Sequence, residues 1–248
     1  MARRKSLAFL DVGQGDCFVA DTKSGAIIFD GGSSSEDQVG RYRILPYMKY
    51  LGYQKIQIAV ISHMDIDHYS GIKELLEMGK IKYLGLPEIP KDETMKKIIG
   101  IAKKRGTTIF YFSRGRQITT KDGSLKVLHP QKNSQMEKNA ASLVMQGKIL
   151  GYRVLLTGDV EKEGEEELLS EELERADILK AAHHGSKNST SNEFLQKVQP
   201  KQTVISCGKQ NRYGHPHLET IHRLQTYRTK IYRTDRSGAI IFFKRRDG

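Results

Sequence analysis

Short apolar runs rich in β-branched residues recur along this chain, and several of them end at an aspartate or a glycine. Examples are AIIFDGG at 26–32, IQIAVIS at 56–62 and YRVLLTGD at 152–159. Runs of this kind are typical of buried strands, and helical patterns stand between several of them. No low-complexity segment or long linker divides the sequence. The pattern therefore predicts a single α/β domain in which helices cover the sheets.

The order of predicted strands and helices in the first part of the chain recurs in the second. We expect one domain over residues 1–248, built from two similar halves at about 6–105 and 106–245. The stretch SGAIIFD at 24–30 is echoed by SGAIIFF at 237–243, which fits two β-rich halves. Two sheets packed face to face, with helices outside, would bury the apolar faces of both.

Composition limits the classes of partner and compartment. The chain carries 41 lysines and arginines against 29 aspartates and glutamates, a net charge of +12. This surplus favours binding to a polyanion such as DNA, although it also serves solubility. The only cysteines, Cys17 and Cys207, cannot build a disulfide framework, which favours a reducing compartment. No apolar run reaches the ~18 residues of a membrane helix, so we expect no membrane segment. The sequence leaves the oligomeric state open.

Metal-capable side chains concentrate where predicted strands end. Four of them lie in SHMDIDHYSG at 62–71, directly after a strand: His63, Asp65, Asp67 and His68. The same position after a strand is taken by Asp30, by Asp159 and by the pair His183 and His184. Strand ends at one sheet edge converge, and gathered carboxylates repel one another unless a cation neutralises them. These residues therefore predict a site for a pair of divalent ions.

The stretch HMDIDH at 63–68 resembles the HxHxDH signature of metallo-β-lactamase-fold hydrolases, with Asp65 in place of the middle histidine. FDGG, LTGD and a late histidine match the other metal-binding elements in order. FLDVGQGDC, NAASLVM, LKAAHHGSKNS and NRYGHPH further resemble the C-terminal domain of the ComEC-type competence DNA-uptake protein, and the likeness covers residues 9–240. The resemblance implies a four-layer αββα sandwich and a metal-dependent hydrolase.

A ComEC-type protein carries this domain after a membrane channel. We therefore expect either a free-standing relative in the cytoplasm or an excised domain that works at the extracytoplasmic face.

The resemblance implies ligands for two ions: His63 and Asp65 for the first, Asp67, His68 and His215 for the second, and Asp159 bridging them. Asp30 is expected to orient ligand histidines from behind. Because Asp65 exchanges a nitrogen donor for a hard oxygen, manganese is favoured, with magnesium and zinc as alternatives.

Two ions ~3.5–4 Å apart would acidify a bridging water for in-line attack, which makes Asp67 and Asp159 catalytic through the metals. His183 or His184 is expected to act as a ligand or to protonate the leaving group. The third-motif histidine of the superfamily is absent. We expect the polar side chains nearest the site to contact the substrate: Ser186, Asn188, Ser189, Asn139 and Ser142.

These features predict a two-metal phosphodiesterase that cleaves DNA, most simply a nuclease. Two alternatives stay open: a metallo-hydrolase of a small-molecule ester, lactam or thioester, and a non-catalytic nucleic-acid-binding module. His129 and His222 are expected to be structural or surface residues. The acidic run at 161–174 would repel DNA, so it is expected to face away from the site.

Overall fold

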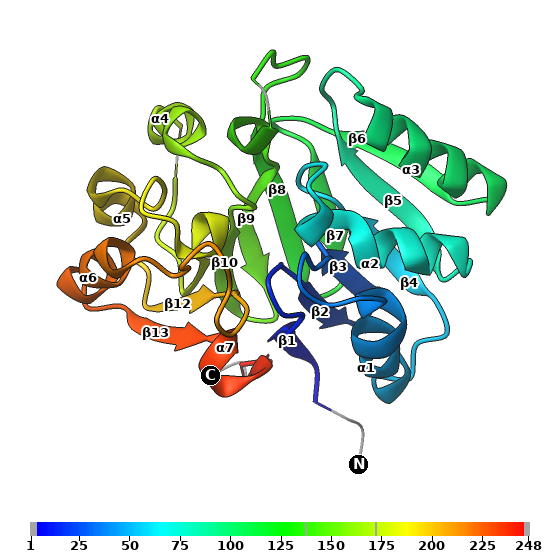
Figure 1. Cartoon of the computed structure of the whole chain (residues 1–248), viewed down its shortest axis with the longest axis horizontal. Coiled ribbons are helices and arrows are strands. Elements are labelled where there is room, and N and C mark those ends of the chain that lie inside the picture. The colour runs from blue at the N-terminus through cyan, green and yellow to red at the C-terminus, as the bar shows by residue number, and fades with distance from the viewer. Residues whose placement is uncertain (1–3, 137, 172, 246–248) are drawn as a thin grey trace.

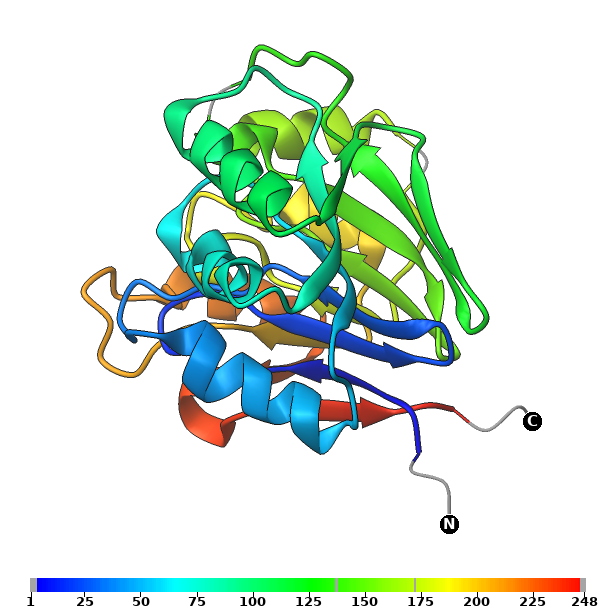
Figure 2. The same cartoon turned by 90° about the vertical axis from the view of Figure 1, so that its right-hand side faces the viewer.

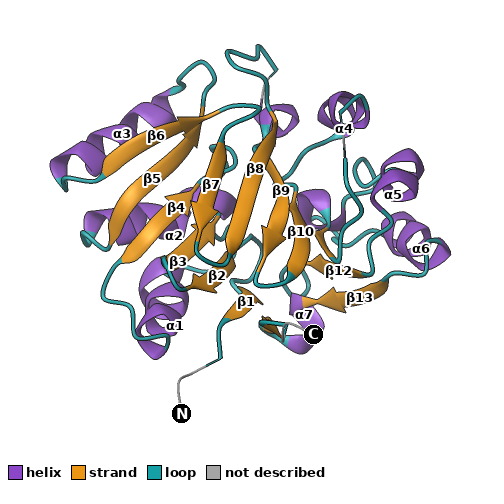
Figure 3. Ribbon diagram, turned by 180° about the vertical axis from the view of Figure 1, so that it is seen from behind, coloured by secondary structure: helices purple, strands orange, loops and turns teal. Residues whose placement is uncertain are grey.

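The computed structural model describes residues 4–136, 138–171 and 173–245. In these ranges two seven-stranded sheets pack face to face, and helices cover the outer face of each (Figures 1 and 3). The predicted four-layer αββα sandwich in a single domain is confirmed. None of the helices in the described ranges is both long and apolar enough to cross a membrane.

The first sheet has the order β14-β1-β2-β3-β4-β5-β6. Its strands are β1 (Ser6–Phe9), β2 (Phe18–Thr22), β3 (Gly25–Phe29), β4 (Ile56–Val60), β5 (Ile81–Pro87), β6 (Thr108–Phe112) and β14 (Ile240–Phe243). The strands from β3 to β6 are parallel, whereas β1 pairs antiparallel with both β2 and β14. The beginning and the end of the chain thus meet in one sheet.

The second sheet has the order β13-β12-β11-β10-β9-β8-β7. Its strands are β7 (Gln117–Thr120), β8 (Gly123–His129), β9 (Val144–Ile149), β10 (Tyr152–Leu156), β11 (Ile178–Lys180), β12 (Gln202–Ile205) and β13 (Lys230–Arg233). Strands β10 to β13 are parallel. Strand β7 is short and polar, and no apolar run in the sequence marks it.

The two sheets do not coincide with the sequence halves 6–105 and 106–245. Strands β6 and β14 fall in the second half, yet both belong to the first sheet. The reason is that β6 completes a β-α-β unit with β5 and the helix between them, so the chain changes sheet only after β6. The echoed stretches lie in β3 and β14, which are strands of the same sheet.

Three layers of buried apolar side chains hold the sandwich together, one between the two sheets and one between each sheet and its helices. Helices α1 (Leu45–Tyr50), α2 (Ile66–Glu77) and α3 (Glu93–Lys104) pack on the first sheet, α4 (Lys162–Leu169), α5 (Asn192–Val198) and α6 (Leu218–Thr226) on the second (Figure 1). The short segments are the π-helix η1 (Gly40–Ile44), the 3-10 helices η2 (Lys138–Ala141) and η3 (Ala182–Gly185), and α7 (Thr234–Ser237). Strand β3 reads as continuously apolar because Ile28 faces the helices while Ile27 and Phe29 face the second sheet.

The first turn of α2 is held in place by two neighbouring loops. The backbone N–H of Asp16 donates to the carbonyl of Asp67 (3.0 Å), and that of Gly31 donates to the carbonyl of His68 (2.8 Å). The helix begins at Ile66, and two metal-capable side chains lie in its first turn. A side chain on Gly32 would not fit, because its Cβ would lie 2.6 Å from the backbone nitrogen of His68.

We expect Gly32→Ala to lower the free energy of unfolding by roughly 1–3 kcal/mol, because α2 must move away from the loop. The control is Gly100→Ala inside α3, where a Cβ meets nothing within 4 Å. This change should raise stability by up to about 1 kcal/mol. Urea denaturation of both variants measures the difference. A Gly32→Ala variant as stable as the wild type would contradict the tight packing.

Candidate metal centre

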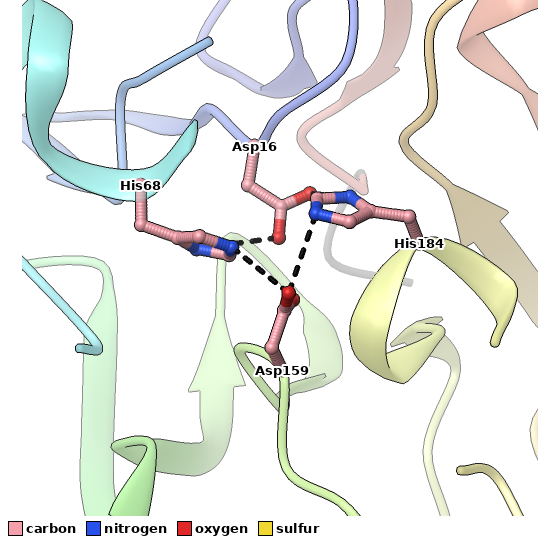
Figure 4. Close-up of side chains that lie close together, drawn as sticks. All are labelled: Asp16, His68, Asp159 and His184. Atoms are coloured by element: carbon pink, nitrogen blue, oxygen red, sulfur yellow. Dashed lines mark ion pairs between the residues drawn. The ribbon is translucent and has the colours of Figure 1, made fainter. Parts of the chain in front are cut away.

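Four buried side chains meet where strands of both sheets end: Asp16, His68, Asp159 and His184 (Figure 4). One ligand atom from each lies within 4.8 Å of the others. Oδ2 of Asp159 is central, 3.2 Å from Nε2 of His68 and 3.3 Å from Nε2 of His184. The four come from the loop after β1, the first turn of α2, the loop after β10, and η3. The fold therefore assembles the cluster from four separate segments.

The donor set fits a divalent cation. Nε2 of His63, of His68 and of His184 is buried and forms no hydrogen bond with any described residue. Buried polar atoms are nearly always paired, so three such atoms turned toward carboxylates call for a ligand. Imidazole nitrogens together with carboxylate oxygens are the usual ligands of zinc and manganese.

The two remaining aspartates of HMDIDH lie at the rim of the cluster. Oδ2 of Asp65 is 3.6 Å from Nε2 of His63, and Oδ2 of Asp67 is 3.3 Å from Nε2 of His184. The nearby imidazole of His63 lowers the pKa of Asp65 against the effect of burial. Burial raises the pKa of Asp67, but the nearby imidazole of His184 and the charge of His68 outweigh it, so this pKa falls to about 2. Both carboxylates are ionised at neutral pH.

The rings of the cluster are oriented from behind. Oδ2 of Asp30 lies 3.0 Å from Nδ1 of His68, and Oδ1 of Asp30 accepts the backbone N–H of Ser62 (2.7 Å). Nδ1 of His184 donates to the carbonyl of Ser206 (2.9 Å). Such contacts hold Nδ1 as the donor and leave Nε2 available to a metal.

A lysine lies beneath the cluster. Lys180, the last residue of β11, is 4% exposed. Its ammonium contacts the carboxylate of Asp16, lies 3.4 Å from Oδ1 of Asp159 and donates to the carbonyl of Gly158 (2.8 Å). Lys180 thus engages one oxygen of Asp159, and the other oxygen faces the histidines.

The sequence analysis identified neither Asp16 nor Lys180. Asp16 carries a signal that was available, since it stands in the loop after β1, as Asp30 and Asp159 stand after their strands. Lys180 carries none, because a lysine at the end of an apolar strand is usually solvated.

The charges in the cluster stabilise one another. Burial raises the pKa of Asp159, but the charges of His184 and His68 outweigh it, and Lys180 adds to them. The pKa of Asp159 is therefore well below its usual range. Burial lowers the pKa of His184, but the carboxylates of Asp159 and Asp16 raise it to about 10. Without a metal the ring is protonated at neutral pH, so a metal must displace a proton to bind.

The two adjacent histidines have different surroundings. Both adopt left-handed backbone angles, with φ of 47° at His183 and 52° at His184. This conformation is uncommon for non-glycine residues and often marks functional sites. His184 is buried in the cluster, whereas His183 is half-buried, with Nδ1 2.8 Å from Oε1 of Glu161 and Nε2 3.8 Å from Oδ2 of Asp159. The structure therefore places His184 in the cluster and His183 beside it, where the sequence did not distinguish the two.

The cluster opens into a cleft of about 270 Å³. Its walls come from six segments of the chain: Gln14, Ser34, Met64, Asp65, Ile66, Asp67, Asp159, His183, His184, Tyr213 and His215. Nε2 of His184 lies beside Asp159. The His215 ring lies in the cleft wall with its centroid 6.0 Å from that of the His184 ring, and the ligand role predicted for His215 stays a prediction. Burial lowers the pKa of His215, and the rings of His184 and His183 lower it further, to about 4. His215 is thus a neutral imidazole in the cleft wall.

The polar residues of HHGSKNS do not line this cleft. The Ser189 hydroxyl donates to the carbonyl of Ala182 (3.0 Å), and the Ser186 hydroxyl accepts the backbone N–H of Asn188 (3.3 Å). Asn188 is exposed and lines a separate cleft of about 490 Å³ together with Ser189. In the structure the serine hydroxyls brace the loop that carries the histidines, and the substrate contacts predicted for these three residues stay a prediction.

Asn139 and Ser142 also lie behind the site. The Ser142 hydroxyl accepts the backbone N–H of Asp159 (3.3 Å), and the carbonyl of Asn139 accepts the backbone N–H of Ser142 (3.0 Å). Neither lines the cleft. They support the loop of Asp159, and their predicted contact with substrate likewise stays a prediction.

Two glutamates of the acidic run at 161–174 take part in packing. Glu165 is buried and accepts the backbone N–H of Ser191 (3.0 Å), and Glu167 binds Arg114 and Nδ1 of His129. His129 is fully buried and also hydrogen-bonds the carbonyl of Ala140, which is the structural role expected of it. Glu161 departs from the expectation, because it reaches His183 at the cleft.

Comparison with known protein families matches residues 10–209 to the metallo-beta-lactamase superfamily. ComE operon protein 3 of Bacillus subtilis is 37% identical over 259 residues, which cover 96% of this chain and 33% of the relative. Competence protein ComA of Neisseria gonorrhoeae is 29% identical, with coverages of 96% and 32%. Recombination protein 2 of Haemophilus influenzae is 29% identical, with coverages of 93% and 28%. The chain spans about a third of the length of these relatives.

Solved structures show the same fold at low sequence identity. The metallo-beta-lactamase fold protein YhfI of Bacillus subtilis superposes with a TM-score of 0.63 at 14% identity, covering 95% of this chain and 99% of YhfI. The short form of human tRNase Z gives a TM-score of 0.54 at 13% identity, with coverages of 96% and 99%. These likenesses establish the arrangement of sheets and helices.

Replacing the buried lysine should destabilise the metal-free protein. We expect Lys180→Met to lose about 3–5 kcal/mol of unfolding free energy near neutral pH, because two buried carboxylates lose their counter-charge. Urea denaturation in EDTA measures this loss. Lys96→Met, on the exposed face of α3, is the control and should leave the midpoint unchanged. Equal stability of Lys180→Met and the wild type would show that Lys180 does not balance the cluster.

The metal-free protein should become less stable at alkaline pH. The pKa of His184 is raised from 6.5 to about 10, so the stability that its ion pairs contribute is fully present below pH 6.5. That contribution is lost as pH rises through about 10. Thermal melting in EDTA should show a steeper alkaline loss for the wild type than for His184→Gln. Identical pH profiles of the two proteins would contradict the assignment.

Proposed function

The chain belongs to the metallo-β-lactamase superfamily, and from this membership and its cleft we propose that it is a metal-dependent phosphodiesterase that cleaves DNA. The membership and the buried donor set support metal-dependent hydrolysis. The observation that carries the proposal is the convergence of three unpaired Nε2 atoms and several carboxylates at an open cleft. Relatives named as competence and recombination proteins, together with the net charge of +12, favour DNA as the substrate.

We propose two divalent ions, with manganese favoured over magnesium and zinc because carboxylates make up much of the donor set. The residues that would hold them are His63, Asp65, Asp67, His68, Asp159 and His184. This set replaces His215 by His184, which the geometry places beside Asp159. When bound, such ions activate water and neutralise charge on the phosphate.

The side chains around the donors would orient them and move a proton. Asp30 and Lys180 hold His68 and Asp159 in place, so the donors need little rearrangement. Glu161 orients the His183 ring through Nδ1 and leaves Nε2 directed toward the cleft. A protonated His183 can then deliver its Nε2 proton to the alkoxide that departs from phosphorus.

A small-molecule ester, lactam or thioester is the second candidate substrate. The observation that favours it is the size of the cleft, since about 270 Å³ lies just below the roughly 300–1,000 Å³ of ordinary ligand pockets. A phosphodiester strand fits the same cleft if only one nucleotide enters and the rest follows the surface.

The test is cleavage of end-labelled single- and double-stranded DNA with manganese, magnesium, zinc or EDTA. We expect cutting with manganese, none with EDTA, and a loss of roughly 100-fold or more in Asp159→Asn. Asp92→Asn is the matched control, because Asp92 only caps α3 by accepting the backbone N–H of Met95. This variant should cut like the wild type.

Each other outcome has a defined meaning. If the wild type binds metal but leaves DNA intact while hydrolysing small esters, the substrate is a small molecule. If it binds DNA and takes up no metal, it is a binding module, and the phosphodiesterase proposal fails.

A further inference from the structure

A tyrosine stands at the mouth of the cleft with much of its ring in solvent. Tyr213 is 43% exposed and lines the cleft from the loop at 206–217, between β12 and α6. Figure 2 shows this loop, in orange, projecting from the body of the sandwich. The loop sequence NRYGHPH is one of the stretches that carry the family resemblance, but the proposed metal binding and proton transfer give its tyrosine no role.

The ring is held in a defined orientation. It stacks on the imidazole of His215 with centroids 5.7 Å apart and planes at 20°. The side chain of Asn211 ties the loop together: its Nδ2 donates to the carbonyls of Gly208 (2.9 Å) and His215 (2.7 Å), and its Oδ1 accepts the backbone N–H of His215 (3.0 Å). The aromatic surface is therefore organised in advance of any ligand.

The residues around the ring suit a flat, anionic ligand. The Arg212 guanidinium lies 4.8 Å from the centre of the Tyr213 ring and is exposed. Met64 and Ile66 line the cleft from the segment that begins α2, and Ile66 is 53% exposed. Aromatic rings and guanidinium planes both stack with bases, and a guanidinium also binds phosphate. The mouth of the cleft thus offers apolar surface and positive charge next to the donor cluster.

We propose that Tyr213 stacks an unpaired nucleobase beside the scissile phosphodiester, so that the cleft acts on single-stranded DNA and frayed ends in preference to paired duplex. This inference rests on the proposed function. A base in a duplex is already stacked on its neighbours, and it must leave the stack before an aromatic side chain can take it. The cleft volume of about 270 Å³ matches a part of one strand.

Binding in EDTA tests the stacking separately from cleavage. The probes are a labelled oligothymidine and an oligomer of the same length made of abasic nucleotides, measured by fluorescence anisotropy. We expect the wild type to bind oligothymidine more tightly than the abasic strand. Tyr213→Ala should weaken binding of oligothymidine by roughly 5- to 150-fold and leave the abasic strand unchanged. Tyr213→Phe should behave like the wild type, because it keeps the ring.

The matched control is Tyr50→Ala, since Tyr50 is also an exposed, stacked tyrosine but lies on α1 and does not line the cleft. It should bind both strands like the wild type. With manganese, Tyr213→Ala should raise KM on single strands and lower the preference for single over double strands.

The outcomes separate the two proposals. If the wild type cuts DNA and Tyr213→Ala keeps both the base preference in binding and the strand preference in cleavage, the stacking inference is overturned. If the wild type cuts DNA with none of the metals tested but Tyr213→Ala still abolishes the base preference in binding, the proposed cleavage fails and the stacking role stands. If the wild type binds neither strand in EDTA and cuts DNA with none of the metals, both proposals fail.

Discussion

The structure around the cleft depends on one buried ion pair network, in which the ammonium of Lys180 faces the carboxylates of Asp16 and Asp159. Carboxylates packed this closely repel one another in a low-dielectric interior, and a divalent ion that comes and goes cannot be their only counter-charge. The lysine supplies a permanent positive charge from below. The other carboxylate oxygen of Asp159 then faces the histidines of the cluster, and the loops of both sheets can close around the cluster.

The side chains around this ion pair network are also held by neighbouring groups. Donors nearest the cluster are held by groups behind them, as His68 is held by Asp30, so that unpaired nitrogen atoms face a common point. His183 and His184 leave η3 in adjacent, left-handed conformations, which directs one ring into the cluster and the other to the cleft wall. The proposed function gives these two neighbours in sequence different roles, His184 as a metal ligand and His183 as a proton donor held by Glu161.

In the proposed function, loops supply the parts of the site that contact substrate, and the sheets supply its rigidity. The loop at 206–217 carries an aromatic surface to the mouth of the cleft, while the strand ends beneath it hold the charged donors. This division explains why a cleft on a common fold can be selective. The fold fixes where hydrolysis takes place, and the proposed stacking on Tyr213 would determine which kind of strand reaches it.

Local pattern alone determined much of this protein. Apolar runs located most strands, HMDIDH located the donors that lie within one turn of each other, and Asp30 was recognisable at a strand end. Tertiary structure alone decided the rest, because contacts between distant segments have no local signature. It placed β6 and β14 in the first sheet. It put His184 beside Asp159 and His215 in the cleft wall, and it engaged the hydroxyls of Ser186 and Ser189 in hydrogen bonds that brace a loop. It also buried Lys180, since only packing distinguishes a solvated lysine at a strand end from one enclosed by two carboxylates.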